Sequence, residues 1–212
     1  MNRTATLAIF SGTFSILAVL LVPVVVKANF DIFNDPTEFL AAADNVFFES
    51  FETQPANNVT NQLFFELDNF TVTANEAELG IFNTPNVGGN PTDGTQYLGI
   101  SADIVTFDLD TSVNSFAFSL IDFGDNGDGE LTFSNSAGED TVVSLSGGGD
   151  GNVQFFGFVN PNLSFDQVVL TNTVPGEFYA IDATSSANAI PEPIAIPLLA
   201  LCPSPFALST RR

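Results

Sequence analysis

The sequence predicts an all-β protein: an antiparallel β-sandwich, jelly-roll-like, with one short N-terminal helix. From about residue 46 onward the chain is a series of short, Phe-rich segments separated by Gly, Asn, Asp and Pro, with no helical pattern between them. The 23 Phe residues, against two Tyr and no Trp, fit a core built on buried rings. No repeat of fixed period is present, which argues against a propeller or a solenoid.

A single helix is expected at the start of the domain, over residues 34–43. Asn34 and Asp35 are suitable N-cap residues, Pro36 and Glu38 suit the first turn, and good helix formers follow. Everything after this helix is expected to be strand. The expected strands are 46–51, 62–73, 78–82, 96–100, 104–109, 115–122, 130–134, 141–145, 153–159, 165–171 and 177–183.

Alternation of large apolar residues with polar or small ones is clearest in two of these segments. Val105, Phe107 and Leu109 alternate in one, and Phe116, Phe118 and Leu120 alternate in the other. This pattern predicts strands with one buried face and one face in water.

The distribution of charge excludes several classes of function. The chain has 25 acidic residues, no His and four basic residues, which are Arg3, Lys27, Arg211 and Arg212, for a net charge of −21. Nucleic acids, phosphorylated substrates and anionic lipids all require cationic side chains. A Ser or Cys nucleophile would lack a His or Lys base, and the single Cys202 cannot build a zinc site. Oxygen-rich sites for Ca²⁺ remain possible.

The N-terminal segment, residues 1–28, is expected to be a signal peptide. Arg3 precedes an apolar stretch from Leu7 to Val26, and small residues around Lys27 predict cleavage by signal peptidase before Asn29. The apolar stretch is longer than usual for a signal peptide, so an uncleaved membrane anchor is the alternative. The sandwich domain is expected over residues 29–188.

The C-terminal segment, residues 189–212, combines a rigid Pro191-Glu192-Pro193 element, an apolar run from Ile194 to Leu208, and Arg211-Arg212. This order resembles the PEP-CTERM sorting tail of bacterial surface proteins. The resemblance implies transient membrane association, processing by an exosortase, and delivery to the cell surface or the extracellular matrix. Three further prolines interrupt the apolar run, which departs from the family pattern and leaves a Pro-rich disordered terminus as the alternative.

A second resemblance covers most of residues 46–183. The segments 48–51, 105–109, 116–125 and 178–182 are similar to PEP-CTERM surface proteins with a lectin-like jelly-roll body. This resemblance implies a structural Ca²⁺ held by Glu49 on the first strand and Asp182 on the last. Many related sequences carry a second Asp where this chain has Ala183. The alternative is that Glu49 and Asp182 are simply exposed acids at strand ends.

Four weaker candidates complete the set. The acidic segment 122–130 and the glycine-rich segment 147–152 are interpreted as turns, since neither has the spacing of a calcium or phosphate loop. Asp108 and Asp110 could share one strand face as a glycosidase pair, but Asp110 is better placed to start a turn. Tyr97 and Tyr179 are the candidate platforms for sugar rings.

These observations predict a non-enzymatic exported protein at the cell surface or in the matrix, with a structural or glycan-associating role in exopolysaccharide or biofilm. The alternative is a Ca²⁺-dependent carbohydrate-binding module, and a carboxylate-based glycoside hydrolase has less support. The expected partners are signal peptidase and exosortase during processing, and extracellular polysaccharide afterwards.

Overall fold

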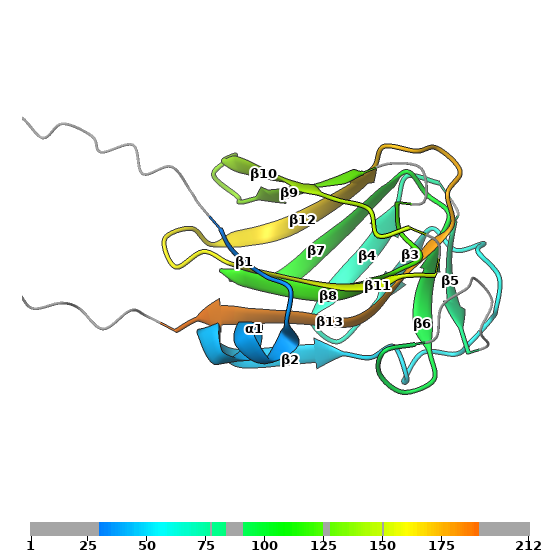
Figure 1. The fold of residues 1–212 in the computed structure, drawn as a ribbon, viewed down its shortest axis with the longest axis horizontal. Helices are drawn as coiled ribbons and strands as arrows, with labels where there is room; N and C mark the ends of the chain where they lie inside the picture. The colour runs from blue at the N-terminus through cyan, green and yellow to red at the C-terminus, as the bar shows by residue number, and fades with distance from the viewer. Residues whose placement is uncertain (1–29, 77, 84–90, 125–127, 150, 191–212) are drawn as a thin grey trace, which may run out of the picture.

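The computed structural model describes residues 30–76, 78–83, 91–124, 128–149 and 151–190, which form an antiparallel β-sandwich with one short helix (Figure 1). Helix α1 spans Pro36–Ala42. The strands are β1 Asp31–Phe33, β2 Ala43–Glu49, β3 Phe64–Glu66, β4 Phe70–Ala74, β5 Leu79–Phe82, β6 Tyr97–Ile100, β7 Ile104–Val113, β8 Ser115–Ile121, β9 Gly129–Ser134, β10 Asp140–Leu145, β11 Val153–Val159, β12 Phe165–Asn172 and β13 Tyr179–Ala189.

The strands form two sheets. Sheet A has seven strands in the order β1-β11-β8-β13-β6-β5, with β2 also paired to β13, and sheet B has six in the order β10-β9-β12-β7-β4-β3. Eight of these strands form the two four-stranded groups β2-β13-β8-β11 and β7-β12-β9-β10, in which the chain crosses repeatedly from one sheet to the other. This is the jelly-roll arrangement that the sequence predicted.

The last strand, β13, organises sheet A. One of its edges pairs with β8, while the other pairs first with β6 and then with β2. The pairing with β8 changes register between Asp182 and Ser185, at a β-bulge where Ala183 has φ 52°. The bulge divides β13 into two halves, which share β8 on one edge and pair with β6 and β2 respectively on the other.

The helix begins as predicted. Oδ1 of Asp35 accepts hydrogen bonds from the amides of Thr37 (2.7 Å) and Glu38 (3.1 Å), and Pro36 occupies the first turn. Phe39 is its buried residue and packs on the outer face of sheet A near Phe155, with ring centroids 6.0 Å apart. The helix therefore covers part of that face.

Most predicted strands are confirmed, with differences in their number and bounds. Strand β2 begins at Ala43, where the helix was expected to end, and β7 continues to Val113, beyond the predicted end at residue 109. The predicted strand 62–73 is two strands, β3 and β4, which pair with each other across the intervening residues. Strand β13 continues to Ala189, beyond the predicted end at residue 183, because its second half pairs with β2. The short β1 was not predicted, since three residues are too few to show an alternating pattern.

The core between the sheets is aromatic, as expected. Phe30, Phe133, Phe158 and Phe165 contact one another through their rings, and Phe107 lies beside Phe116 at 5.5 Å between ring centroids. The inward residues of both sheets contribute to this one cluster.

The outer faces of the two sheets differ in burial. Strand β7 alternates as predicted, with Val105, Phe107 and Leu109 buried. The prediction of a wet face is wrong for β8, because all seven of its residues are buried. Its outward residues include Ala117 and Ser119, and Ala117 belongs to a second apolar cluster with Phe39 of α1.

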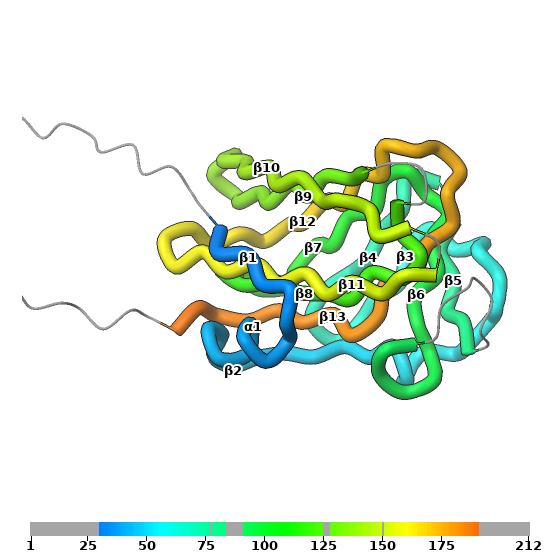
Figure 2. Tube along the Cα trace, viewed as in Figure 1, coloured from blue at the N-terminus to red at the C-terminus, as the bar shows by residue number. Residues whose placement is uncertain are grey.

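The described chain begins and ends at the same end of the sandwich (Figure 2). Among the described residues no helix has the length and apolar character needed to cross a membrane.

Candidate functional site

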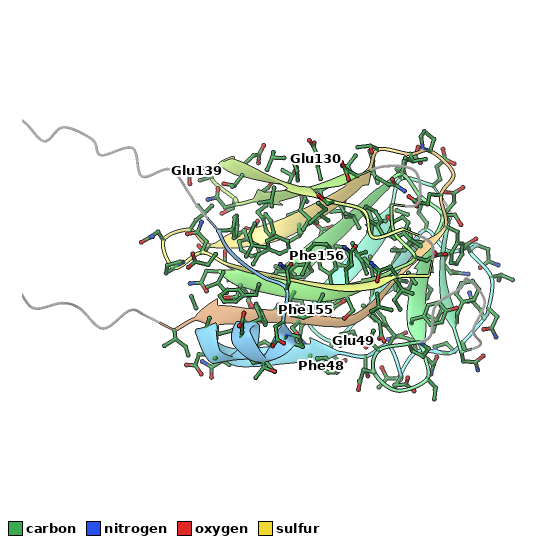
Figure 3. The ribbon with its side chains drawn as sticks, in the orientation of Figure 1. Phe48, Glu49, Glu130, Glu139, Phe155 and Phe156 are labelled. Carbon is green, nitrogen blue, oxygen red and sulfur yellow. The ribbon has the colours of Figure 1, made fainter. Side chains whose placement is uncertain are left out.

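An apolar groove lies on the outer face of sheet A, beside α1. It has a volume of about 580 Å³, within the range typical of ligand pockets. Phe48 of β2 and Phe155 of β11 lie near α1 (Figure 3). The residues that line this α1 groove are Pro36, Phe39, Leu40, Val46, Phe48, Thr92, Ser119, Phe155, Ala183 and Ser185.

The sequence places large side chains on the walls of the α1 groove and small ones on its floor. The walls come from the helix, through Leu40, and from the edge strand β2, through Phe48. Each of these two side chains is 52% exposed. The floor comes from the paired strands β8 and β13, at Ser119 and Ser185. No ionisable side chain is among the lining residues, although the chain carries a net charge of −21.

The carboxylate of Asp182 lies beside the floor of the α1 groove. It accepts hydrogen bonds from Thr92, one of the residues that line the groove. Its Oδ2 accepts hydrogen bonds from the Thr92 amide (2.5 Å), the Thr92 hydroxyl (2.9 Å) and the Asp93 amide (2.8 Å). Its Oδ1 accepts one from the Ala183 amide (2.8 Å). Burial raises the pKa of Asp182, and these hydrogen bonds oppose the rise because they stabilise the ionised form.

The carboxylate of Glu52 holds the other end of the same loop. Its Oε1 accepts from the amides of Thr95 (2.5 Å) and Gln96 (2.6 Å). These backbone hydrogen bonds lower the pKa of Glu52. Residues 92–96 are therefore held in place by hydrogen bonds from their backbone amides to two carboxylates. These amides, rather than basic side chains, stabilise the two negative charges.

The two residues predicted to bind Ca²⁺ lie on neighbouring strands. Glu49 is opposite Thr184 in the β2–β13 register, whereas Asp182 is opposite Ser119 in the β13–β8 register. Because Ser119 and Phe48 both line the α1 groove, the alternation of strand residues puts Asp182 on the groove face and Glu49 on the opposite face. The structure thus brings the strands together but directs the two carboxylates apart.

Glu49 has its own local partner. It is half-buried, and its Oε1 accepts a hydrogen bond from the Phe51 amide at 2.6 Å. Burial raises the pKa of Glu49, the Phe51 hydrogen bond opposes this, and the negative charge of Asp68 adds to the rise. The part of the chain that is described contains no group of three or more Asp, Glu, His or Cys side chains suited to a metal. Ca²⁺ binding at Glu49 and Asp182 stays a prediction, and backbone carbonyls or water would have to supply most of its ligands.

The expectation for the two tyrosines is wrong. Tyr97 is 1% exposed and stacks on Phe82, and Tyr179 is fully buried beside Phe123. Neither ring can serve as a platform for a sugar. Instead, Phe47, Phe48 and Phe64 are exposed, which the sequence analysis missed because it assigned phenylalanine to the core.

The outer face of sheet B carries a second candidate surface, made of regular rows of side chains. Strand pairing aligns one row across all six strands and a second row beside it. The first row is Val142, Thr132, Val169, Thr106, Thr73 and Phe64. The second row is Asp140, Ser134, Gln167, Asp108, Thr71 and Glu66.

We call these two rows the sheet B platform. Its first row presents methyl groups and ends at the exposed Phe64 ring, and its second row presents hydroxyl, amide and carboxylate groups. Five strand spacings of about 4.8 Å make each row roughly 24 Å long. The platform can therefore contact an extended ligand that has both an apolar face and a polar edge.

The possible glycosidase pair lies at this platform. Asp110 does not start a turn as expected, because β7 continues to Val113 and places Asp110 two residues after Asp108 on the same exposed face. Oδ1 of Asp108 accepts a hydrogen bond from Nε2 of Gln167 at 2.8 Å.

The acidic and glycine-rich segments meet at one end of the sandwich. Asp122 accepts a hydrogen bond from the Gly151 amide (2.6 Å), and Asp128 accepts one from the Gly147 amide (3.1 Å). The described parts of both segments connect strands, as predicted, although residues 125–127 and 150 lie outside the described residues.

The sorting motif also lies outside the described residues. Pro191, Glu192, Pro193, Arg211 and Arg212 follow Ile190, the last residue described, and the predicted signal peptide precedes Phe30, the first. Export and sorting remain predictions from the sequence.

No protein-family model and no curated protein matches the sequence. Solved structures with a similar fold include a family 29 carbohydrate-binding module (13% identity, 68% of this chain and 93% of that one, TM-score 0.39). The K2 cleaved adhesin domain of Lys-gingipain is also similar (11% identity, 67% and 99%, TM-score 0.46). A third is a carbohydrate-binding module in complex with β-1,4-galactotriose (12% identity, 66% and 95%, TM-score 0.35). At these values the ligand of this chain has to be argued from its own surface.

Proposed function

We propose that this chain is an exported protein of the cell surface or extracellular matrix that binds a neutral polysaccharide without cleaving it. The observation that carries the proposal is the sheet B platform, with its methyl row ending at Phe64 and its polar row beside it. A pyranose ring has an apolar C–H face and hydroxyl groups around its edge. Such a ring can pack on the methyl row while its hydroxyls bond to the polar row.

Charge supports a neutral ligand. The polar row contains Asp140, Asp108 and Glu66, which accept hydrogen bonds from hydroxyls but repel carboxylates and sulfates. No basic residue lies between residues 28 and 210 to neutralise an anionic polymer. Uronic-acid and sulfated polysaccharides should therefore bind poorly.

The test is a glycan array followed by affinity measurement with the full chain. Phe64→Ser and Gln167→Ala should each weaken binding of the best neutral glycan by about five- to tenfold, since each removes roughly 1 kcal/mol of contact. Phe48→Ser is the matched control, because Phe48 is equally exposed but belongs to the other face. Equal losses from all three variants, or binding to anionic glycans alone, would contradict the proposal.

Calcium dependence is tested in the same experiment. If a chelator abolishes glycan binding and lowers the unfolding temperature, and Glu49→Ala and Asp182→Ala each remove the stabilisation by Ca²⁺, the chain is a Ca²⁺-dependent carbohydrate-binding module. If binding and unfolding temperature are unchanged, the predicted Ca²⁺ site is wrong and the polysaccharide proposal is unaffected.

Export and sorting are proposed from the sequence alone. Mass spectrometry of protein recovered from the surface of an exosortase-containing bacterium should show a new N-terminus near Asn29 and loss of the segment after Pro193. An intact chain in the envelope would instead support the uncleaved anchor.

A structural matrix role is the second candidate, favoured by the net charge of −21. Divalent cations could bridge the acidic faces of neighbouring copies. Light scattering that rises with Ca²⁺ but not with an equal ionic strength of Na⁺, together with no binding on the glycan array, would favour this role.

A further inference from the structure

We infer that the α1 groove is the docking site for this chain's own C-terminal apolar run, residues 194–208, before that segment is inserted or removed. The inference does not depend on glycan binding, which involves the opposite face. It rests on where the described chain ends, on the chemistry of the groove, and on the charge of the segment.

The described chain ends beside the groove. The Ile190 amide donates a hydrogen bond of 3.0 Å to the Ala42 carbonyl, at the last residue of α1. Leu40 lies two residues before Ala42 and lines the groove. Pro191, Glu192 and Pro193 can span about 10 Å when extended, comparable to the length of α1, which is also about 10 Å. Ile194 can therefore reach the groove.

The chemistry of the two partners matches. The groove presents apolar walls and no ionisable side chain, and the sequence from Ile194 to Thr210 also contains no charged residue. Apolar surface buried in such a contact stabilises it by about 25 cal/mol per Å². The groove offers little to the acidic parts of another copy, because two chains that each carry −21 repel one another.

Charge also favours the C-terminal segment. Arg211 and Arg212 are two of the four basic residues in the chain, and the body to which they would return is strongly acidic. The N-terminal apolar segment is a weaker candidate, because the chain enters through Phe30, whose ring packs against Phe133 in the seam between the sheets. Docking would shield the apolar run from water until a membrane competes for it.

The single cysteine provides a direct test, because Cys202 lies within the segment. In the full chain, Phe48→Cys places a thiol in the groove, and Phe47→Cys places one on the opposite face of the same strand at the next residue. The two positions have similar exposure, 52% and 49%, and nearly the same distance along β2 from the chain end. Under mild oxidation we expect the disulfide within one chain to form at least tenfold faster with Phe48→Cys.

A second pair of cysteine variants leaves the Phe48 ring intact, and so controls for the effect of removing that ring from the groove. Leu40→Cys lines the groove, and Ala41→Cys is exposed on the same helix without lining it. The same preference is expected, and 1 M NaCl should reduce but not abolish it, because salt screens the arginines while leaving the apolar contact.

Two results would overturn the inference. Equal disulfide rates within both pairs would show that the segment does not occupy the groove. Disulfides that form only between chains, with a rate that rises with protein concentration, would assign the groove to a second copy.

Discussion

The outer faces of the two sheets are built from similar strands, but they differ in how much of each face is buried and in the side chains that it presents. On sheet A, α1 and the loop at residues 92–96 cover part of the face, so that β8 is buried throughout and an uncharged groove remains between the covering elements. On sheet B, the strands alternate and present a row of methyl groups beside a row of polar side chains. Glu130 and Glu139 lie at β9 and β10, on the far side from α1 (Figure 3). The lesson is that a strand's own sequence decides its inward face, whereas its outer face depends on what packs there.

The largest difference between the faces should appear when an aspartate is removed from each. Asp182→Ala removes a buried carboxylate that accepts hydrogen bonds from the amides of Thr92, Asp93 and Ala183, so we expect a loss of about 3 kcal/mol in the free energy of unfolding. Asp108→Ala on sheet B should cost less than about 0.5 kcal/mol, since that carboxylate is exposed. Urea unfolding measures both, and similar losses would remove the distinction between the faces.

The next effect concerns the contact between the helix and sheet A. A Cβ at Gly157 would lie 2.7 Å from Cδ2 of Phe39, so Gly157→Ala should displace α1 and cost about 2 kcal/mol. Hydrogen exchange should show faster opening of α1 and β2 and unchanged protection in sheet B. Uniform loss of protection would show that the helix is not an independent covering element.

A smaller, opposite effect is expected at the bulge in β13. Ala183 has φ 52°, a conformation that glycine adopts more easily, so Ala183→Gly should stabilise the protein by about 0.5–1 kcal/mol. Thermal unfolding provides the measurement. A lower unfolding temperature would mean that the Ala183 side chain contributes more through its contacts in the groove than its backbone conformation costs.

The smallest effect is expected from mild acid. Burial raises the folded-state pKa of Asp182 and Glu49, so the folded state binds more protons than the unfolded state just above the usual carboxyl range, and stability should increase as pH falls from 7 toward 5. At lower pH the order reverses, because Glu52 and Asp35 have lowered pKa values and their contribution is lost as they are protonated.

Denaturant unfolding at several pH values, with Asp182→Asn as control, tests this sign. The control should flatten the rise between pH 7 and 5. Two effects contribute to this pH dependence, and high salt separates them. Salt screens the general repulsion that comes from the net charge of −21, whereas it screens the buried carboxylates less. A fall in stability over this range for the unmodified protein would contradict the expectation.

The sandwich and most of its strands can be predicted from the amino-acid sequence. Alternation in residues such as Val105, Phe107 and Leu109 defines a buried face wherever the strand is placed, and Asp35 with Pro36 starts a helix through purely local hydrogen bonds and geometry. The absence of basic residues from the body also indicated that its carboxylates need other partners. The structure shows these to be backbone amides, as at Asp182 and Glu52.

Tertiary structure decided the sites. The sequence placed Glu49 and Asp182 on the first and last strands, but the bulge at Ala183 and the registers on either side of it direct the two side chains to opposite faces. Residue type alone does not distinguish an exposed phenylalanine from a buried one. Phe48 and Phe64 are exposed because they lie on edge strands, and the positions of those strands follow from the tertiary structure. Likewise, the rows on sheet B join residues up to about 100 positions apart, and only the pairing of distant strands brings them into line.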